Sequence, residues 1–268
     1  MRLGARVVKI EPPEGDATPE AWYRALNDGK EILSWDARTE PTPPVVAVAD
    51  VVLEGFRPGV FERLGVELSP RAILCSITGF GETGPHAGDA GHDLNYLGYA
   101  GILADDPVVP PVQIADLAGG AQAALVEILA ALYERERTGS GSRIVVSMTH
   151  GAHRLAAHRL AGEPVSRLLT GGAACYHVYE TADGRHLTVA ALEPRFWQNL
   201  CALLERPDLA GRAFEPELPE LAALFRSQPL AHWLDLLEGK DTCVGPVLTL
   251  VEAATELRAA SEAAAGGD

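Results

Sequence analysis

Residues 114–148, IADLAGGAQAALVEILAALYERERTGSGSRIVVSM, contain the clearest structural pattern in this chain. Apolar side chains recur there at steps of three and four residues, the period of one face of an α-helix. They are Leu117, Ala121, Leu125, Ile128 and Leu132. We predict a helix over residues 117–137, with Asp116 as its N-cap and the glycine-rich residues 138–141 as its end. The apolar run at 143–148 predicts a strand directly after this helix.

Other apolar runs indicate how the rest of the chain is organised. Residues 6–11, 45–53 and 71–78 predict further strands, and strands that alternate with helices are typical of a parallel sheet. We therefore predict an α/β fold, with a Rossmann-like large domain over residues 1–165. Two alternating runs that flank Ala-Asp-Gly then predict a hairpin, followed by a helix that starts at Pro194. Residues 166–268 are predicted to form a smaller α+β domain.

Composition and charge exclude several classes of partner. The formal net charge of −15 argues against a nucleic-acid-binding surface, which needs Lys and Arg to neutralise phosphates. It leaves room for one anionic small molecule held by local arginines. The four cysteines form no C-x-x-C pair, so we expect reduced thiols and no metal site. We find no apolar run of the ~18 residues that a membrane span needs and no signal-peptide pattern, and we expect a cytoplasmic protein.

His92 and Asp116 are the first candidate catalytic residues. His92 follows a glycine-rich loop, and histidine is the side chain best suited to proton transfer near neutral pH. Its commoner role would be a loop histidine that hydrogen-bonds the backbone. Asp116 stands at the start of a predicted helix, where the helix dipole should lower the pKa of its carboxyl group. Its commoner role would be a helix cap.

The glycine pair Gly119-Gly120 lies inside the predicted helix, where each glycine costs about 1 kcal/mol relative to alanine. Such a pair predicts that a ligand or another helix comes close to the backbone there. Backbone N–H groups near Gly119 could also hold a developing oxyanion.

Glu193, Arg57 and Arg63 are weaker candidates. Glu193 could be an ordinary acid at a helix start. The two arginines flank a Pro-Gly turn after an apolar strand, the end of the sheet where ligands bind in open α/β folds. The glycine-rich loop at 79–84 matches neither the Walker pattern nor G-x-G-x-x-G, so the glycines alone do not predict nucleotide binding.

Six ordered blocks, spread along most of the chain, resemble the family III CoA-transferases of the CaiB/BaiF type. That family includes formyl-CoA transferase, carnitine CoA-transferase and α-methylacyl-CoA racemase, and the chain is most similar to the racemase branch. The blocks are GARVVKIEPPEGD, ADVVLEGFRPGVFERLGVE, SITGFGETGPHAGDAGHDLNYLGYAGIL, the 114–148 stretch, CYHVYETADGRHLTVAALEPRFWQNLC and CVGPVLTLVEA.

The resemblance implies roles for three residues. Asp116 stands where transferases of the family keep the aspartate that forms an acyl anhydride. In the racemase branch, the matching aspartate is an acid/base opposite the histidine of a G-H-D-x-N-Y motif, which is His92 in the block GHDLNY. Glu193, in A-L-E-P-x-F, matches a third active-site acid that lies near that histidine.

The resemblance also implies a coenzyme A thioester as substrate, with no tightly bound cofactor. Arg57 and Arg63 would lie near the CoA nucleotide. The turn formed by Thr78, Gly79, Phe80 and Gly81 would lie along the pantetheine arm.

Compared with the family pattern, this chain is shortened at both ends. It starts after the usual first strand and the Gly-Pro-containing helix, and it stops soon after the CVGPV block. Members of the family close a ring through which a second subunit threads. We therefore expect a homo-oligomer, a dimer, without a complete interlocked ring and with an incomplete CoA site.

Three functions are compatible with these residues. The first is an acyl-CoA racemase or epimerase of α-methyl-branched thioesters, in which His92 and Asp116 exchange the α-proton and backbone donors near Gly119 hold the enolate. The second is a CoA-transferase that uses Asp116 as its anhydride-forming nucleophile, with a structural His92. The third is a truncated, non-catalytic paralogue that binds CoA.

Overall fold

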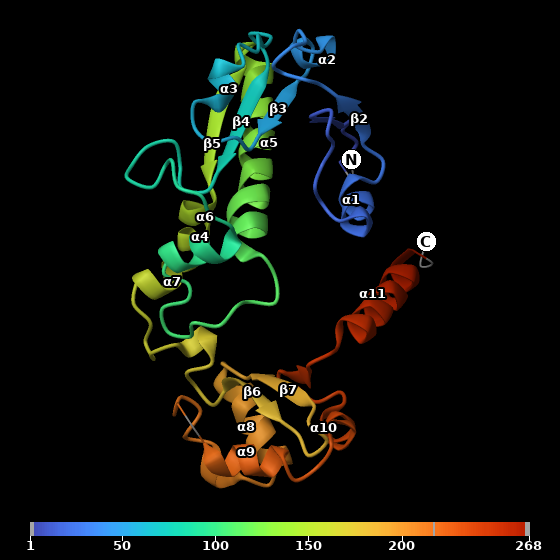
Figure 1. Ribbon diagram of the computed structural model, residues 1–268. Coiled ribbons are helices and arrows are strands. Elements are labelled where there is room, and N and C mark those ends of the chain that lie inside the picture. The colour runs from blue at the N-terminus through green and yellow to red at the C-terminus, as the bar shows by residue number, and fades with distance from the viewer. Residues whose placement is uncertain (1–2, 217, 266–268) are drawn as a thin grey trace. The chain divides into compact units, whose positions relative to one another are not determined.

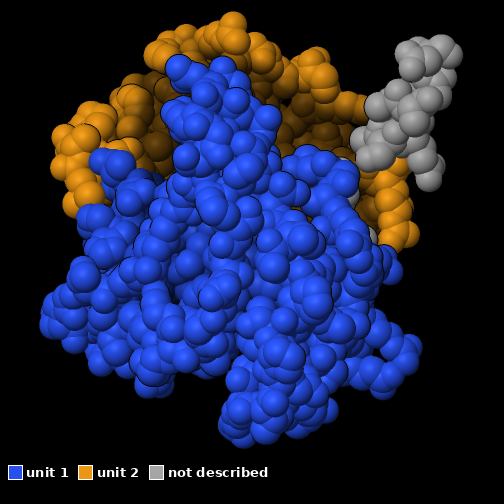
Figure 2. All heavy atoms as spheres, turned by 90° about the horizontal axis from the view of Figure 1, so that it is seen from above, with its two compact units in different colours: residues 1–157 blue, residues 158–268 orange. Residues whose placement is uncertain are grey.

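The computed structural model describes residues 3–216 and 218–265. The chain divides into two compact units, Met1–Ala157 and His158–Asp268, which Figure 2 shows in blue and orange. We predicted domains of 1–165 and 166–268. This division into domains stays a prediction. Each unit is described here by itself.

A parallel three-stranded sheet forms the centre of the first unit (Figure 1). Its strands are β3 (Val51–Glu54), β4 (Ile73–Thr78) and β5 (Ser142–Ser147), in the order β3-β4-β5. Helix α5 (Ala123–Thr138) packs on this sheet. The buried side chains between them are Ile73, Cys75, Ala124, Ile128, Ile144 and Val146. The parallel sheet and its covering helix confirm the predicted α/β class.

A second cluster of buried side chains lies where β4 and β5 end. It joins α4 (Asp93–Tyr99), the helical segment η1 (Ala115–Gln122) and α6 (Met148–Leu155), which pack against one another. Its buried members are Phe80, Tyr96, Leu97, Ala100, Ala115 and Ala152. The candidate residues His92 and Asp116 lie at the starts of α4 and η1, so this cluster fixes both.

The helix predicted over residues 117–137 starts differently from the prediction. It begins as a π-helix, η1, whose wider turns continue into α5. Its N-cap is Ile114, and Asp116 lies inside the first turn without a capping hydrogen bond. The predicted N-cap role of Asp116 is therefore wrong. Gly139 ends α5 as predicted, because its φ of 77° is a left-handed conformation that glycine adopts freely.

The segment Ala115–Thr138 is long and apolar enough to cross a membrane by length and composition alone. A helix in the core of a globular domain passes the same test. Ala124 and Ile128, on its inner face, are buried beside the sheet. The expectation that a membrane is not among the partners stays a prediction.

The N-terminal residues form a small parallel pair of their own. Strand β1 (Val8–Glu11) pairs with β2 (Glu31–Ser34), and α1 (Glu20–Asn27) connects them. The sequence predicted β1 but not β2, because Glu31–Ser34 is short and lies in a polar region.

The strand predicted over residues 45–53 is only partly correct. Pro44 occupies the first turn of a short helix, α2 (Pro44–Ala47), and the strand is confined to Val51–Glu54. Proline is favoured at a helix start, and a short run of valines does not distinguish a buried helix from a buried strand. Helix α3 (Val60–Arg63) then connects β3 to β4.

The second unit is built on an antiparallel sheet of β6 (Tyr176–Glu180), β7 (His186–Ala190) and β8 (Val244–Pro246). Its hairpin β6–β7 is as predicted. The largest fully buried side chains here include Trp197 and Phe225. The helical elements of this unit are α7 (Ala157–Leu160, which starts in the first unit), η2 (Leu168–Thr170), α8 (Pro194–Leu203), η3 (Pro207–Leu209), α9 (Pro219–Phe225), α10 (Leu230–Leu237) and α11 (Leu250–Ala265).

Candidate active site

His92 is the N-cap residue of α4, and its backbone is held in place from within the motif. Its N–H donates to Asn95 Oδ1 over 3.1 Å, as part of a capping box at the start of α4. The side chain is exposed and lines a pocket of about 260 Å³ together with Asp93, Leu94 and residues 109–113. The imidazole can therefore reach a bound molecule.

Tyr96 anchors the loop that carries His92. Its hydroxyl donates to the carbonyl oxygen of Gly91 over 2.5 Å, one residue before His92. Its ring fills the space beside two glycines: a Cβ at Gly79 would lie 2.5 Å, and one at Gly91 2.7 Å, from Tyr96 Cε1. The aromatic ring therefore joins the end of β4 to the loop before α4.

Replacing Tyr96 with phenylalanine should lower stability without changing the packing of the ring. The Gly91 carbonyl would lose its donor, which costs about 1 kcal/mol and lowers the melting temperature by roughly 2–4 °C. Calorimetry checks this value. Tyr99→Phe is the matched control, because among the described residues the Tyr99 hydroxyl has no hydrogen-bond partner. Equal melting temperatures for the two variants would contradict the anchoring role of Tyr96.

Asp116 presents a carboxyl group in an unusual environment. One of its oxygens, Oδ1, is buried and has no hydrogen-bond partner among the described residues. Burial raises the pKa of this carboxyl group, and the negative charge of Asp93 raises it further, while the positive charge of His92 acts in the opposite direction. The predicted lowering of the Asp116 pKa is wrong. Because Asp116 does not cap the helix, loss of solvent outweighs the helix dipole.

The structure brings His92 and Asp116 into one neighbourhood. The charge of His92 acts on the Asp116 carboxyl group. The residue next to His92, Asp93, accepts a hydrogen bond of 2.9 Å from the Asp116 backbone N–H. Burial raises the pKa of the Tyr96 hydroxyl group on α4, and the negative charge of Asp116 raises that pKa further. The imidazole and the carboxyl group, from distant parts of the sequence, are therefore close enough to interact electrostatically.

The glycine pair of η1 packs against another helix. A Cβ at Gly119 would lie 2.6 Å from the backbone nitrogen of Ala152, and one at Gly120 would lie 2.8 Å from Met148 Cγ. The close approach of a helix, one of the two predicted explanations, is therefore confirmed. Gly119 also lines a pocket of about 340 Å³, and the approach of a ligand and an oxyanion-binding role there stay predictions.

The arginines predicted to bind the CoA nucleotide are both exposed. Arg57 follows β3 and donates to the carbonyl oxygen of Gly88 over 3.4 Å, and Arg63 ends α3. Both therefore lie beyond the carboxyl end of β3, where the sequence analysis placed them. Their contact with a nucleotide stays a prediction.

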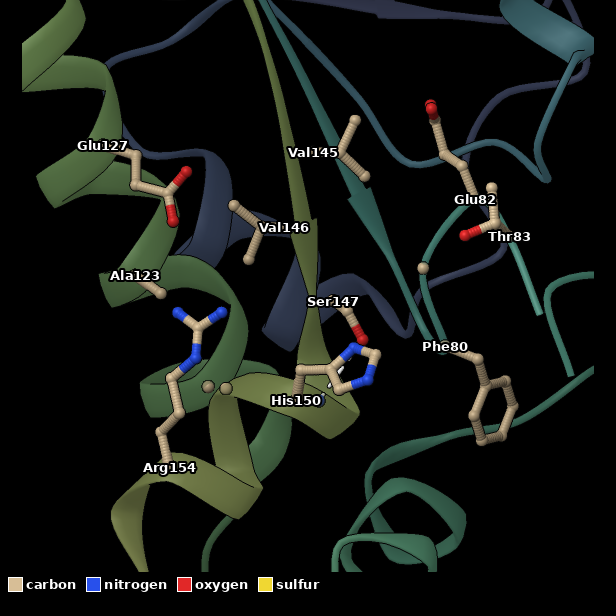
Figure 3. Close-up of a pocket in the computed structure, with 13 residues that line it drawn as sticks. Phe80, Glu82, Thr83, Ala123, Glu127, Val145, Val146, Ser147, His150 and Arg154 are labelled. Atoms are coloured by element: carbon tan, nitrogen blue, oxygen red, sulfur yellow. Dashed lines mark hydrogen bonds between the residues drawn. The ribbon is translucent and has the colours of Figure 1, made fainter. Parts of the chain in front are cut away.

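The turn predicted to follow the pantetheine arm is only partly available to a ligand. The Thr78 hydroxyl donates to the carbonyl oxygen of Val146 and accepts from the Gly81 N–H, and the Gly79 carbonyl accepts from Thr149. Phe80 and Gly81 line a pocket of about 340 Å³. Figure 3 shows this pocket, with Glu127 and Arg154 on one side and His150 beside Ser147.

Glu193 belongs to the second unit. It is the exposed N-cap residue of α8, and its backbone carbonyl accepts the first hydrogen bonds of that helix. The structure therefore places it at a helix start, and its predicted proximity to His92 stays a prediction.

Sequence reasoning missed Asp93. It stands inside the block GHDLNY, but an acid in the first turn of a helix is too common to stand out. The signal is its burial, with 7% of its surface exposed, which only the fold reveals. His150 and Arg154, which line the pocket of Figure 3, were also missed.

The comparison with known protein families decides what this site belongs to. The model of CoA-transferase family III matches residues 2–264. This chain belongs to CoA-transferase family III. The predicted resemblance is confirmed, and it covers nearly the whole chain.

The relatives that match this chain include racemases and CoA-transferases. The chain is 33% identical to the alpha-methylacyl-CoA racemase of Homo sapiens, over 93% of this chain and 72% of the relative. It is 32% identical to the acetyl-CoA:oxalate CoA-transferase of Acetobacter aceti, over 94% and 76%. A crystal structure of Rv3272 from Mycobacterium tuberculosis superposes with a TM-score of 0.78 at 30% identity, covering 97% of this chain and 80% of that one. The chain is therefore a family III enzyme, a racemase or a CoA-transferase.

Proposed function

We propose that this enzyme is an acyl-CoA racemase that acts on α-methyl-branched thioesters. The observation that carries the proposal is the Asp116 carboxyl group, which is partly buried, has a raised pKa and is electrostatically coupled to His92. A raised pKa suits a carboxyl group that must hold and return a proton near neutral pH. Similarity to the racemases of human and mouse supports the same choice.

The proposed reaction moves one proton at one carbon. His92 or Asp116, whichever is unprotonated, takes the α-proton, and the C–H electron pair enters the thioester as an enolate. The other residue, which starts protonated, gives its proton to the opposite face of the same carbon. The C–H bond formed balances the C–H bond broken, and the two side chains exchange protonation states. A second turnover in the opposite direction restores them.

Recognition of the substrate uses the CoA part of the molecule. Arg57 and Arg63 would carry the phosphates, and the Phe80–Gly81 turn would contact the pantetheine arm. The negative net charge of the protein makes such local arginines necessary, because the chain as a whole repels anions.

The experiment is exchange of the α-proton with solvent. Purified protein is incubated in heavy water with (2R)- or (2S)-2-methylacyl-CoA, and mass spectrometry follows deuterium at the α-carbon. Incorporation that accompanies inversion is the expected result. Absence of exchange with short, medium and long branched chains, in protein shown to be folded, would overturn the proposal.

A CoA-transferase is the second candidate, favoured by the acetyl-CoA:oxalate transferase among the relatives. In that reaction the Asp116 carboxylate attacks the thioester carbonyl, the C–S bond breaks and CoA thiolate leaves. Hydroxylamine would then trap Asp116 as a hydroxamate, visible in a peptide map, and turnover would need a second carboxylic acid. Trapping together with no α-proton exchange would select this function over racemisation.

A further inference from the structure

Among the described residues, Asp93 makes the one side-chain hydrogen bond that joins the start of α4 to the start of η1. It is the first residue of α4 and follows His92 in the chain. Its Oδ1 accepts the backbone N–H of Asp116 over 2.9 Å, across 23 positions of sequence. The Asp93 side chain is 7% exposed, so few water molecules can compete for this hydrogen bond. A movement of η1 away from α4 would break this hydrogen bond.

The same carboxylate also acts through its charge. In the part of the chain that the structure describes, Asp93 and His92 are the residues whose charge shifts the pKa of the Asp116 carboxyl group. Two carboxylates in one partly buried site resist being ionised together, so the charge of Asp93 favours the protonated form of Asp116.

Other ionisable groups lie on the elements that pack against η1. They are Tyr96 and Tyr99 on α4, Cys75 on β4, Arg143 on β5, His150, His153 and Arg154 on α6, and Glu127, Tyr133 and residues 134–137 on α5. None of these groups is among the causes of the Asp116 pKa shift. His153 is occupied by a hydrogen bond of 3.0 Å to the Ala100 carbonyl oxygen. Tyr96 is neutral near pH 7, since burial raises its pKa. Asp93 is therefore the acid whose charge raises the pKa of the Asp116 carboxyl group.

We propose that Asp93 is a positioning residue: its hydrogen bond to the Asp116 backbone holds the Asp116 carboxyl group beside His92, and its negative charge favours uptake of a proton by that carboxyl group. The proposal rests on the proposed racemase function. An acid at a helix start with no further role would only stabilise α4. Only the positioning role predicts that substitution of Asp93 changes the titration and the activity of Asp116, so the test measures both.

Two substitutions of Asp93 separate the effect of its hydrogen bond from the effect of its negative charge. Asp93→Asn keeps an oxygen that can accept the Asp116 N–H and removes the negative charge. Asp93→Ala removes both. Asp106→Asn, an exposed acid in the segment between α4 and η1, is the matched control for loss of one charge. Nuclear magnetic resonance of labelled aspartate carboxyl carbons gives the titration of Asp116 in each folded protein, and α-proton exchange gives the activity.

Asp93→Asn should move the Asp116 titration, and the matching limb of the pH–rate profile, to lower pH, with exchange retained. Asp93→Ala should lower kcat for exchange by roughly 10²-fold with little change in KM, since misplacing a catalytic group by about 1 Å has that effect. Asp106→Asn should change neither. An unmoved Asp116 titration in Asp93→Asn, or wild-type kcat in Asp93→Ala, would overturn the proposal. If wild-type protein shows no exchange, the racemase function fails, and the carboxyl titration still decides whether Asp93 tunes Asp116.

Discussion

Replacing Asp116 with asparagine is expected to lower kcat for racemisation by roughly 10²–10⁴-fold, the usual contribution of a general acid or base. The amide has nearly the same shape as the carboxyl group but cannot carry the proton. The fold of η1 does not need the carboxylate, because Asp116 caps no helix and its Oδ1 has no hydrogen-bond partner among the described residues. KM should therefore change little. The measurement is the rate of inversion of a single 2-methylacyl-CoA enantiomer.

The stability of the same variant provides an internal control. Asp116 has a higher pKa in the folded protein than its ordinary value of 3.8, so the folded state binds the proton more tightly. Its contribution to stability is full below pH 3.8 and is lost as pH rises through the folded pKa. The Asp116→Asn variant has no such carboxyl group and does not lose this stability. The melting temperature of the variant minus that of wild type should therefore be larger at pH 7 than at pH 3.5. Racemisation within tenfold of wild type would remove Asp116 from the mechanism.

Replacing Gly151 with alanine is expected to destabilise the protein through one contact between two helices. A Cβ at Gly151 would lie 2.0 Å from the backbone oxygen of Gly119, closer than any real contact. Because the obstacle is backbone, α6 and η1 must separate. Overpacking of this kind costs about 1–3 kcal/mol, or more, and lowers the melting temperature by several degrees. The separation also displaces Asp116, so activity should fall together with stability.

Gly98→Ala is the matched control for Gly151→Ala. Gly98 also lies inside a helix, α4, but nothing is within 4 Å of its Cβ position. Alanine is preferred over glycine in a helix by about 0.5–1 kcal/mol, so this variant should be as stable as wild type or more stable. Thermal unfolding of the two variants should give shifts of opposite sign. Equal destabilisation would show that the contact between Gly119 and Gly151 does not limit the packing of η1.

The regular parts of the fold could be predicted from sequence because their cause is local. Apolar periodicity identified the long helix, and the turn residues 182–184 identified the hairpin of β6 and β7. Residues 45–53 could not be divided correctly, since valines suit both a buried helix and a buried strand. The π-helical start of η1 was not predicted either, and there Gly119 and Gly120 pack against α6, a contact between distant segments that no local pattern contains.

The candidate site could likewise be predicted only in part from the sequence. The motif around His92 and the position of Asp116 are visible in sequence, and both residues lie at helix starts. The direction of the Asp116 pKa shift could not be predicted, because it depends on burial and on Asp93, which the fold brings from 23 positions away. The argument from the helix dipole predicted a lowered pKa for Asp116 instead.

The most direct test of the central claim is single-enantiomer exchange in two variants, His92→Gln and Asp116→Asn. If the two side chains face opposite sides of one carbon, each variant loses racemisation but keeps α-deuterium exchange for one enantiomer only. The two variants should keep opposite enantiomers. Loss of exchange for the same enantiomer in both variants, or wild-type racemisation in His92→Gln, would contradict a reaction shared between His92 and Asp116.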